Sequence, residues 1–159
     1  HMFSAVAFWP AKQPLDVLIS NGLATMAFAL PAGLAAALHD PARGAVAMTG
    51  DGGLMMCTGE LVTAAQQQAN LTIIVFNDGS LSLIDIKRQG MQLPELGFNW
   101  QRPDFAAAAR GFGCSAWRAE SAEEYQDALA AAAATDGPCL IDVVLDPDGY
   151  LDQMRSLRG

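Results

Sequence analysis

The sequence predicts an α/β domain built on a mostly parallel sheet, because short apolar runs alternate with helical patterns along its 159 residues. The runs at 16–20, 45–49, 71–76 and 139–145 are rich in β-branched residues and apolar almost throughout. Strands that are covered on both faces have this continuous pattern, whereas half-exposed strands alternate. A weaker run at 114–118 is a fifth strand candidate.

The segments between these runs carry helix start signals. Ser121 and Glu124 form a capping box, and Asp104 stands where it can cap another helix. Thr58 can cap a third helix, and Glu60 in its first turn favours the helix dipole, so we interpret Glu60 as structural. We therefore expect helices at 29–40, 58–70, 103–111 and 121–133, and one long irregular segment at 90–103.

Composition and charge restrict the partners. The length fits a single domain, 1–159, and only 16% of the residues are charged while 52% are hydrophobic. So few charges predict a large protein interface and a homo-oligomer. The formal net charge of −8 argues against nonspecific binding to nucleic acid or to an anionic membrane.

The apolar segments and the cysteines indicate the compartment. The longest apolar stretch, 23–38, is interrupted by Pro31 and Gly33 and falls short of the length that spans a bilayer. We therefore expect a buried segment and no membrane association. The three cysteines lack the spacing of a metal site, and their odd number favours a reducing compartment. We expect a cytoplasmic protein.

Two acidic residues directly follow strands of the predicted sheet. Asp51 lies in the Gly-Asp-Gly-Gly turn that follows the run at 45–49, and Asp78 lies in the turn that follows the run at 71–76. The 24 residues from 53 to 76 have room for one helix and one strand, so the two strands can be neighbours. Oxygen ligands at adjacent strand ends suit Mg²⁺ or Ca²⁺. Each turn alone is a common structural turn, but the pair predicts a cation site that can face a phosphate group.

Two stretches resemble a known family. The stretch GDGGLMMCTGELVTAAQQQANLTIIVFNDGSLSLIDIKRQG (50–90) resembles the thiamine diphosphate signature, in which a GDG turn is followed, one helix and one strand later, by a double Asn. The stretch SNGLATMAFALPAG (20–33) looks like the second marker of the C-terminal, diphosphate-binding domain of the acetolactate synthase and 2-oxo acid decarboxylase superfamily. The likeness covers about residues 16–150.

The resemblance implies a thiamine diphosphate-binding fold, a three-layer α/β/α domain with a mostly parallel sheet of about six strands. It also implies thiamine diphosphate and Mg²⁺ as cofactors. The metal ligands would be the carboxylates of Asp51 and Asp78 and the main-chain oxygen of Ser80. The side chain of Met26 would support the bent cofactor from below. The implied cofactor-binding residues are Ala24, Thr25, Met26, Gly50, Gly52, Gly53, Leu81 and Ser82.

The same resemblance implies the neighbourhood of the substrate. The helix after Ser80 and the segment 90–103 would form part of a roof over the site, with Leu81, Leu83 and Ile84 lining it. The substrate class would be a 2-oxo acid. The cofactor's carbanion would then carry C–C bond cleavage or formation, as in a lyase or transferase.

Three features depart from the family pattern. Asp78 replaces the usual second Asn, which adds a negative charge beside Asp51, and Ala27 and Ala29 replace usual glycines. The family's catalytic glutamate belongs to a separate pyrimidine-binding domain, and no residue of this chain matches it. We therefore expect that domain to be absent from 1–159, and this chain to form half of an active site that is inactive on its own. The other half would be a pyrimidine-binding domain or subunit.

Two alternatives remain open at the level of sequence. The chain can be a separately encoded or isolated cofactor-binding subunit. It can also be an unrelated Mg²⁺-dependent, doubly wound phosphate-binding domain of the receiver or phosphatase kind. The second alternative is disfavoured because no acidic pair ends the first predicted strand, where Asp16 is followed by apolar residues.

The low charge content generates a testable prediction about assembly. We expect the chain to self-associate at concentrations of tens of micromolar, because exposed apolar surface favours association. Sedimentation velocity over a concentration series measures this directly. A single monomeric species at every concentration would contradict the prediction.

Overall fold

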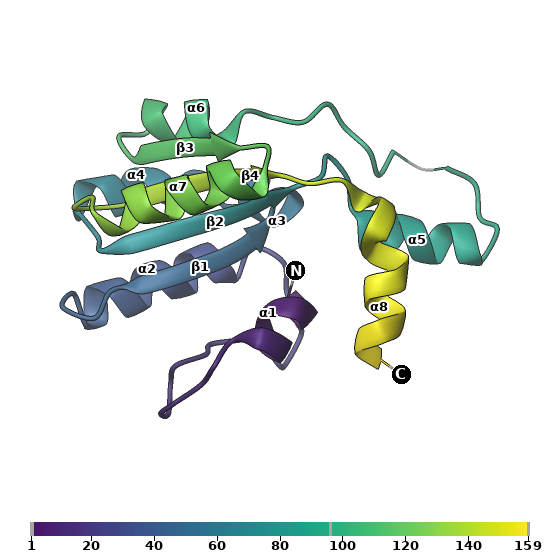
Figure 1. Ribbon diagram of the computed structural model, residues 1–159, viewed down its shortest axis with the longest axis horizontal. Helices are drawn as coiled ribbons and strands as arrows, with labels where there is room; N and C mark the ends of the chain where they lie inside the picture. Colours follow the sequence, from purple (N-terminus) through teal and green to yellow (C-terminus); the bar gives the residue numbers. More distant parts are fainter. Residues whose placement is uncertain (1, 96, 159) are drawn as a thin grey trace.

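In the computed structural model, which describes residues 2–95 and 97–158, the described strands form one parallel sheet with the order β1-β2-β4-β3 (Figure 1). All three pairings are parallel, so the strands share one carboxyl edge. The prediction of an α/β domain with a parallel sheet is therefore confirmed. The strands are β1 (Ala45–Gly50), β2 (Leu71–Asn77), β3 (Ser115–Ala119) and β4 (Cys139–Val144).

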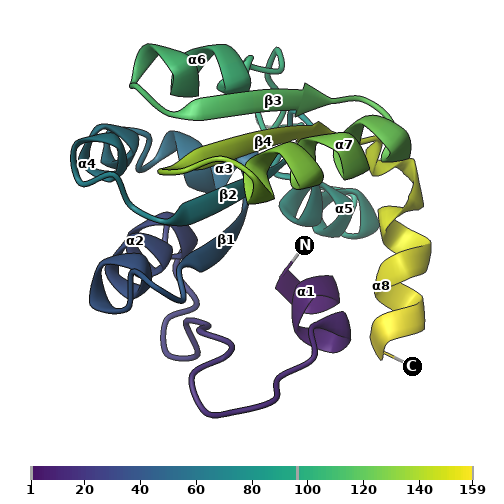
Figure 2. The same cartoon turned by 60° about the vertical axis from the view of Figure 1, so that its left-hand side comes forward.

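Helices cover both faces of this sheet, which makes the three layers (Figure 2). One face is packed by helices α2 (Ala29–His39), α3 (Asp51–Met55), α4 (Glu60–Gln66) and α6 (Phe105–Gly111). The other face is packed by α7 (Ala122–Ala133). Helices α5 (Ser82–Gly90) and α8 (Tyr150–Arg158) lie beyond the carboxyl edge of the sheet, and the short 3₁₀ turn η1 (Pro147–Gly149) precedes α8 (Figure 1). Helix α1 (Met2–Phe8) contacts β1 and α8.

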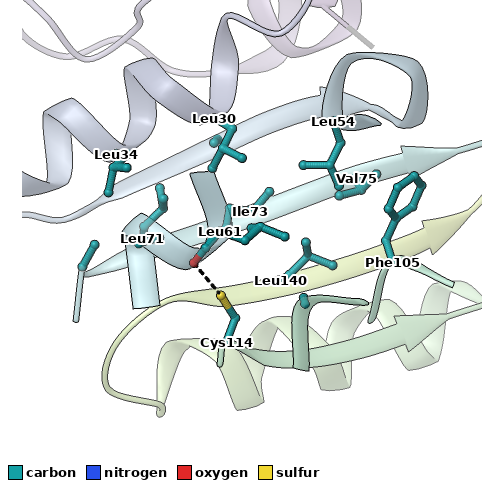
Figure 3. Packing of buried hydrophobic residues seen from close by; sticks show 14 of the residues in the cluster. Leu30, Leu34, Leu54, Leu61, Leu71, Ile73, Val75, Phe105, Cys114 and Leu140 are labelled. Carbon is teal, nitrogen blue, oxygen red and sulfur yellow. Dashed lines mark hydrogen bonds between the residues drawn. The ribbon is translucent and has the colours of Figure 1, made fainter. Parts of the chain in front are cut away.

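The larger hydrophobic core lies between the sheet and the first group of helices (Figure 3). Alternate residues of β2 point into it, and the intervening residue Ile74 points into the smaller core under α7. This two-sided burial is the reason that the central strands are apolar at nearly every position. The labelled residues of the larger core are Leu30, Leu34, Leu54, Leu61, Leu71, Ile73, Val75, Phe105, Cys114 and Leu140.

Local capping fixes the starts of two helices as the sequence predicts, whereas Thr58 does not cap α4, because its hydroxyl donates to the carbonyl of Leu54. The side chain of Asp104 accepts a hydrogen bond from the backbone N–H of Ala107 at the start of α6. Ser121 accepts one from the backbone N–H of Glu124 at the start of α7. Helix α4 ends at Gln66, earlier than expected, and helices α1, α3, α5 and α8 complete the described set.

The expected strand at 16–20 is absent, so the described sheet has four strands instead of about six. This segment is irregular, and its apolar side chains Val17, Leu18 and Ile19 are exposed. Its apolar pattern suits a strand, but the segment pairs with no edge of the sheet. Asp16 instead closes a local turn by accepting hydrogen bonds from the backbone N–H groups of residues 12 and 13, and it forms an ion pair with Arg43.

Candidate functional site

The parallel register of β1 and β2 brings the two predicted acids together. Gly50, the last residue of β1, lies opposite Phe76 of β2. The chain therefore leaves both strands at the same level, and Asp51 and Asp78 emerge side by side at the carboxyl edge. Ligands of open parallel sheets bind at this edge.

Asp51 links the two turns through its carboxylate. One oxygen accepts a hydrogen bond from the backbone N–H of Gly52 at 2.7 Å, and the other accepts one from Gly79 at 2.8 Å. The residue is only 3% exposed. Asp51 thus fixes the turn after β1 against the turn after β2.

Asp78 is held by the loop that follows it. Its carboxylate accepts hydrogen bonds from the backbone N–H of Ser80 at 3.0 Å and from the hydroxyl of Ser82 at 2.8 Å. Tyr150, at the start of α8, lines the same groove as Asp78. Tyr150 lies far from both motifs in sequence.

The electrostatics of the pair are unfavourable without a cation. Burial raises the pKa of Asp51, and the negative charge of Asp78 raises it further, while the bonds from Gly52 and Gly79 oppose the shift. Burial also raises the pKa of Tyr150, and the charge of Asp78 adds to that shift. Two adjacent acids in a partly buried cleft are an arrangement that a bound cation relieves.

The glycine after Asp51 is needed for packing within the chain itself. A Cβ on Gly52 would lie 2.8 Å from Cδ2 of Leu81 and 3.3 Å from Cε of Met26. The predicted cofactor-supporting Met26, which is 41% exposed, therefore sits directly over the motif turn. At Gly79 the backbone is left-handed, with φ of +76°, and a Cβ there would lie 2.9 Å from Cγ of Arg102.

The structure gathers the predicted residues, except Gly52, around one groove of about 1380 Å³. The segment 24–26 forms one wall, and Ala24 takes a left-handed backbone with φ of 49°. Leu83 and Ile84 of α5 line it as expected, whereas none of the described residues of 90–103 does. That segment therefore supports the site without roofing the groove. The predicted residues that line the groove are Ala24, Thr25, Met26, Gly50, Asp51, Gly53, Asp78, Ser80, Leu81 and Ser82.

Sequence reasoning missed a buried polar network beneath the site. Asp142, with no exposed surface, lies in β4, and its carboxylate accepts hydrogen bonds from Asn77 at 2.9 Å, Phe105 N–H at 3.1 Å and Arg118 at 3.2 Å. Asn77 also donates to the carbonyl of Pro103 at 2.9 Å. A single Asp within an apolar strand was the one sequence signal available for this network.

The donor set is typical of a hard cation. Within the described part of the chain, no group of three or more His, Cys, Asp or Glu side chains is placed to hold a metal. The candidate ligands are instead two carboxylates and the main-chain oxygen of Ser80, all of them oxygens. Mg²⁺ and Ca²⁺ prefer oxygen ligands, and Mg²⁺ commonly takes one or two protein carboxylates with phosphate oxygens and water.

A parallel α/β sheet with acidic strand ends beside a groove defines a class of cofactor-binding domains. Residues 1–143 match the family model of the thiamine pyrophosphate enzyme, C-terminal TPP binding domain, and the chain belongs to this family. The catabolic acetolactate synthase of Raoultella terrigena is 35% identical over 131 residues, which are 82% of this chain and 23% of that protein.

Two further relatives extend the range of chemistries. The probable 2-ketoarginine decarboxylase of Pseudomonas aeruginosa is 29% identical over 84% of this chain and 24% of that protein. The solved structure of the thiamine diphosphate-dependent 4-hydroxybenzoylformate decarboxylase of Rhodococcus jostii RHA1 has a TM-score of 0.71 and 28% identity, covering 77% of this chain and 24% of that one. This chain spans about a quarter of the length of these relatives. No helix among the described residues is long and apolar enough to cross a membrane.

The buried network generates a stability prediction. Asp142→Ala is expected to lower the free energy of unfolding by about 3–5 kcal/mol, because it leaves the buried Phe105 N–H without its acceptor and takes one acceptor each from Asn77 and Arg118. Urea denaturation measures the loss. The matched control is Asp152→Ala, which breaks the exposed Asp152–Arg155 pair and should cost about 0.5 kcal/mol or less. Equal losses in the two variants would contradict the prediction.

The same residue generates a pH prediction. Burial raises the pKa of Asp142, while the bonds from Asn77, Arg118 and Phe105 oppose the shift. The folded chain therefore takes up this proton at a higher pH than the unfolded chain does. The resulting stability is complete below the unfolded pKa and is lost as pH rises through the folded pKa. The stability gap between wild type and Asp142→Ala should thus widen as pH falls from about 7.5 to about 4.5. A gap that narrows would count against this assignment.

Proposed function

We propose that this chain binds the Mg²⁺-diphosphate end of thiamine diphosphate and supplies half of the active site of an acetolactate synthase-like or 2-oxo acid decarboxylase-like enzyme. The observation that carries the proposal is the side-by-side emergence of Asp51 and Asp78 at the edge of the groove lined by residues 24–26. Membership of the thiamine pyrophosphate family supports the cofactor.

The chemistry of the site fits the cation. Asp51, Asp78 and the Ser80 carbonyl offer oxygen ligands, and the raised pKa of Asp51 reflects a charge that Mg²⁺ neutralises. A carboxylate offers about four acceptor sites, so the two backbone bonds to Asp51 leave room for a metal. With a net charge of −8, the chain needs such a cation to hold an anionic diphosphate.

Each part of the groove then has a task. Asp51 and Asp78 hold the metal, and Met26 supports the rings of the cofactor above the Gly52 turn. Leu83 and Ile84 give one wall an apolar surface that excludes water from the substrate side. When bound, the cofactor would supply an electron sink for the negative charge that develops at the carbonyl carbon of a 2-oxo acid.

The remaining requirements are proposed to lie on a partner. No described residue of this chain matches the glutamate of the family, so the second half of the site would come from a pyrimidine-binding domain or subunit. The exposed apolar side chains Val17, Leu18 and Leu23 support an interface with that partner or with a second copy. Turnover would then require the assembly. The free thiols Cys57, Cys114 and Cys139 support a cytoplasmic location.

The test compares ligand stabilisation within each variant. Thermal unfolding of the wild type is expected at a higher temperature with Mg²⁺ and thiamine diphosphate than without, by the equivalent of about 2.7 kcal/mol at a hundredfold excess over Kd. Asp51→Ala should lose this gain because it removes a metal ligand. Asp136→Ala, at the opposite end of the sheet, is the matched control and should keep it.

Two results would contradict the proposal. Equal stabilisation of Asp51→Ala and wild type would show that Asp51 is no ligand. A wild-type chain that gains nothing would show that this half does not hold the cofactor by itself.

A further inference from the structure

Two aromatic side chains outside both motifs face the acid pair. The indole N–H of Trp100 is buried and has no hydrogen-bond partner in the described structure. It faces the Asp51 carboxylate without reaching hydrogen-bond geometry. Tyr150 lines the same groove as Asp78, whose negative charge raises the pKa of the Tyr150 hydroxyl. Each candidate metal ligand therefore has one aromatic donor beside it.

The backbone fixes Trp100 against both motif turns. Its backbone N–H donates to the carbonyl of Gly79 at 2.9 Å, and the backbone N–H of Leu81 donates to the carbonyl of Phe98 at 2.9 Å. Ser80 and Asn99 form an isolated antiparallel bridge between these bonds. The far edge of the indole lies 3.5 Å from the position of a Cβ on Gly52. Trp100 is thus fastened to the loop that would bear the metal ligands.

A second set of bonds places Tyr150. The backbone N–H of Leu145 donates to the carbonyl of Asn77 at 3.0 Å, and Arg102 donates to the carbonyl of Leu145 at 2.8 Å. These bonds tie the connection between β4 and α8 to the end of β2. Tyr150 lines the groove together with Asp51 and Asp78.

The number of hydrogen-bond acceptor sites on each carboxylate limits how the carboxylate can bind a metal. A carboxylate offers about four, of which Asp51 uses two for Gly52 and Gly79, and Asp78 uses two for Ser80 and Ser82. One aromatic donor to each carboxylate in the loaded site would leave about one acceptor site free for a metal. Each acid would then bind the cation through a single oxygen in a fixed direction. Mg²⁺ requires near-ideal octahedral geometry, whereas Ca²⁺ accepts bidentate carboxylates and variable coordination.

We propose that Trp100 and Tyr150 are positioning residues that restrict Asp51 and Asp78 to one-oxygen coordination, so that the site selects Mg²⁺ over Ca²⁺. This inference rests on the proposed function of the acid pair. In the loaded site the buried Trp100 N–H takes Asp51 as its acceptor, because a buried donor without a partner is costly.

The experiment removes the indole N–H of Trp100 or the hydroxyl of Tyr150 and keeps an aromatic side chain at each position. Trp100→Phe and Tyr150→Phe are compared with the matched controls Trp117→Phe on β3 and Tyr125→Phe on α7, which lie in the core under α7. Affinities for Mg²⁺ and for Ca²⁺ are measured by calorimetry at saturating thiamine diphosphate. Both site variants are expected to lose roughly 10- to 100-fold in Mg²⁺ affinity. They should lose less in Ca²⁺ affinity, so that the Mg²⁺/Ca²⁺ ratio falls, while the controls keep both values.

A spectroscopic measurement on the wild type keeps the test valid if a variant does not fold. The indole ¹H–¹⁵N signal of Trp100, identified by removing those of Trp9 and Trp117, should shift when Mg²⁺ and thiamine diphosphate are added. The signal of Trp117 should stay in place.

The outcomes are distinguishable. An unchanged Mg²⁺/Ca²⁺ ratio in the site variants, even with weaker binding of both ions, would indicate general structural damage and overturn the positioning role. A Trp100 indole signal that does not shift when Mg²⁺ and thiamine diphosphate are added would overturn the proposed role of Trp100. Absence of binding by the wild type would overturn the proposed function itself.

Discussion

The functional edge of this sheet depends on the hydrogen bonds that the carboxylate of Asp142 accepts. It lies fully buried in β4 and joins β2 through Asn77, β3 through Arg118 and the start of α6 through the backbone of Phe105. A buried charge is tolerated only when such partners surround it. Because Asn77 is the last residue of β2, the same network sets the direction in which the chain enters the turn that carries Asp78.

The position of Asp51 beside Asp78 is electrostatically unfavourable. Burial and the charge of Asp78 raise the pKa of Asp51, so the hydrogen bonds by which Asp51 joins the two turns are made at an electrostatic cost. Several backbone N–H groups and hydroxyls are arranged around the two acids to hold them in place. Such an arrangement is typical of places where a fold prepares for a ligand, and the ligand class proposed here is a hard cation.

The surface next to the site is unlike that of a self-sufficient domain. Val46 of β1 is 48% exposed, and the half of the sheet that α7 leaves open faces the groove. The chain corresponds to about a quarter of its relatives, whose names describe complete enzymes. The proposed half of an active site and the apolar flank that continues from it are consistent with each other, since a partner that completes the site would also cover the flank.

Local chemistry encodes several parts of this protein, and these parts can be predicted from the sequence. Continuous apolar runs gave β1, β2 and β4, capping residues gave the starts of α6 and α7, and the spacing of the two turns placed Asp51 and Asp78 together. The absence of a strand at 16–20 could not be predicted in this way, because an apolar run becomes a strand only where a sheet edge accepts its backbone hydrogen bonds. The positions of Trp100 beside Asp51 and of Tyr150 beside Asp78 also depend on the tertiary structure, because they bring together residues that are far apart in the chain. The local sequence around each of these residues does not indicate which distant residue it will approach.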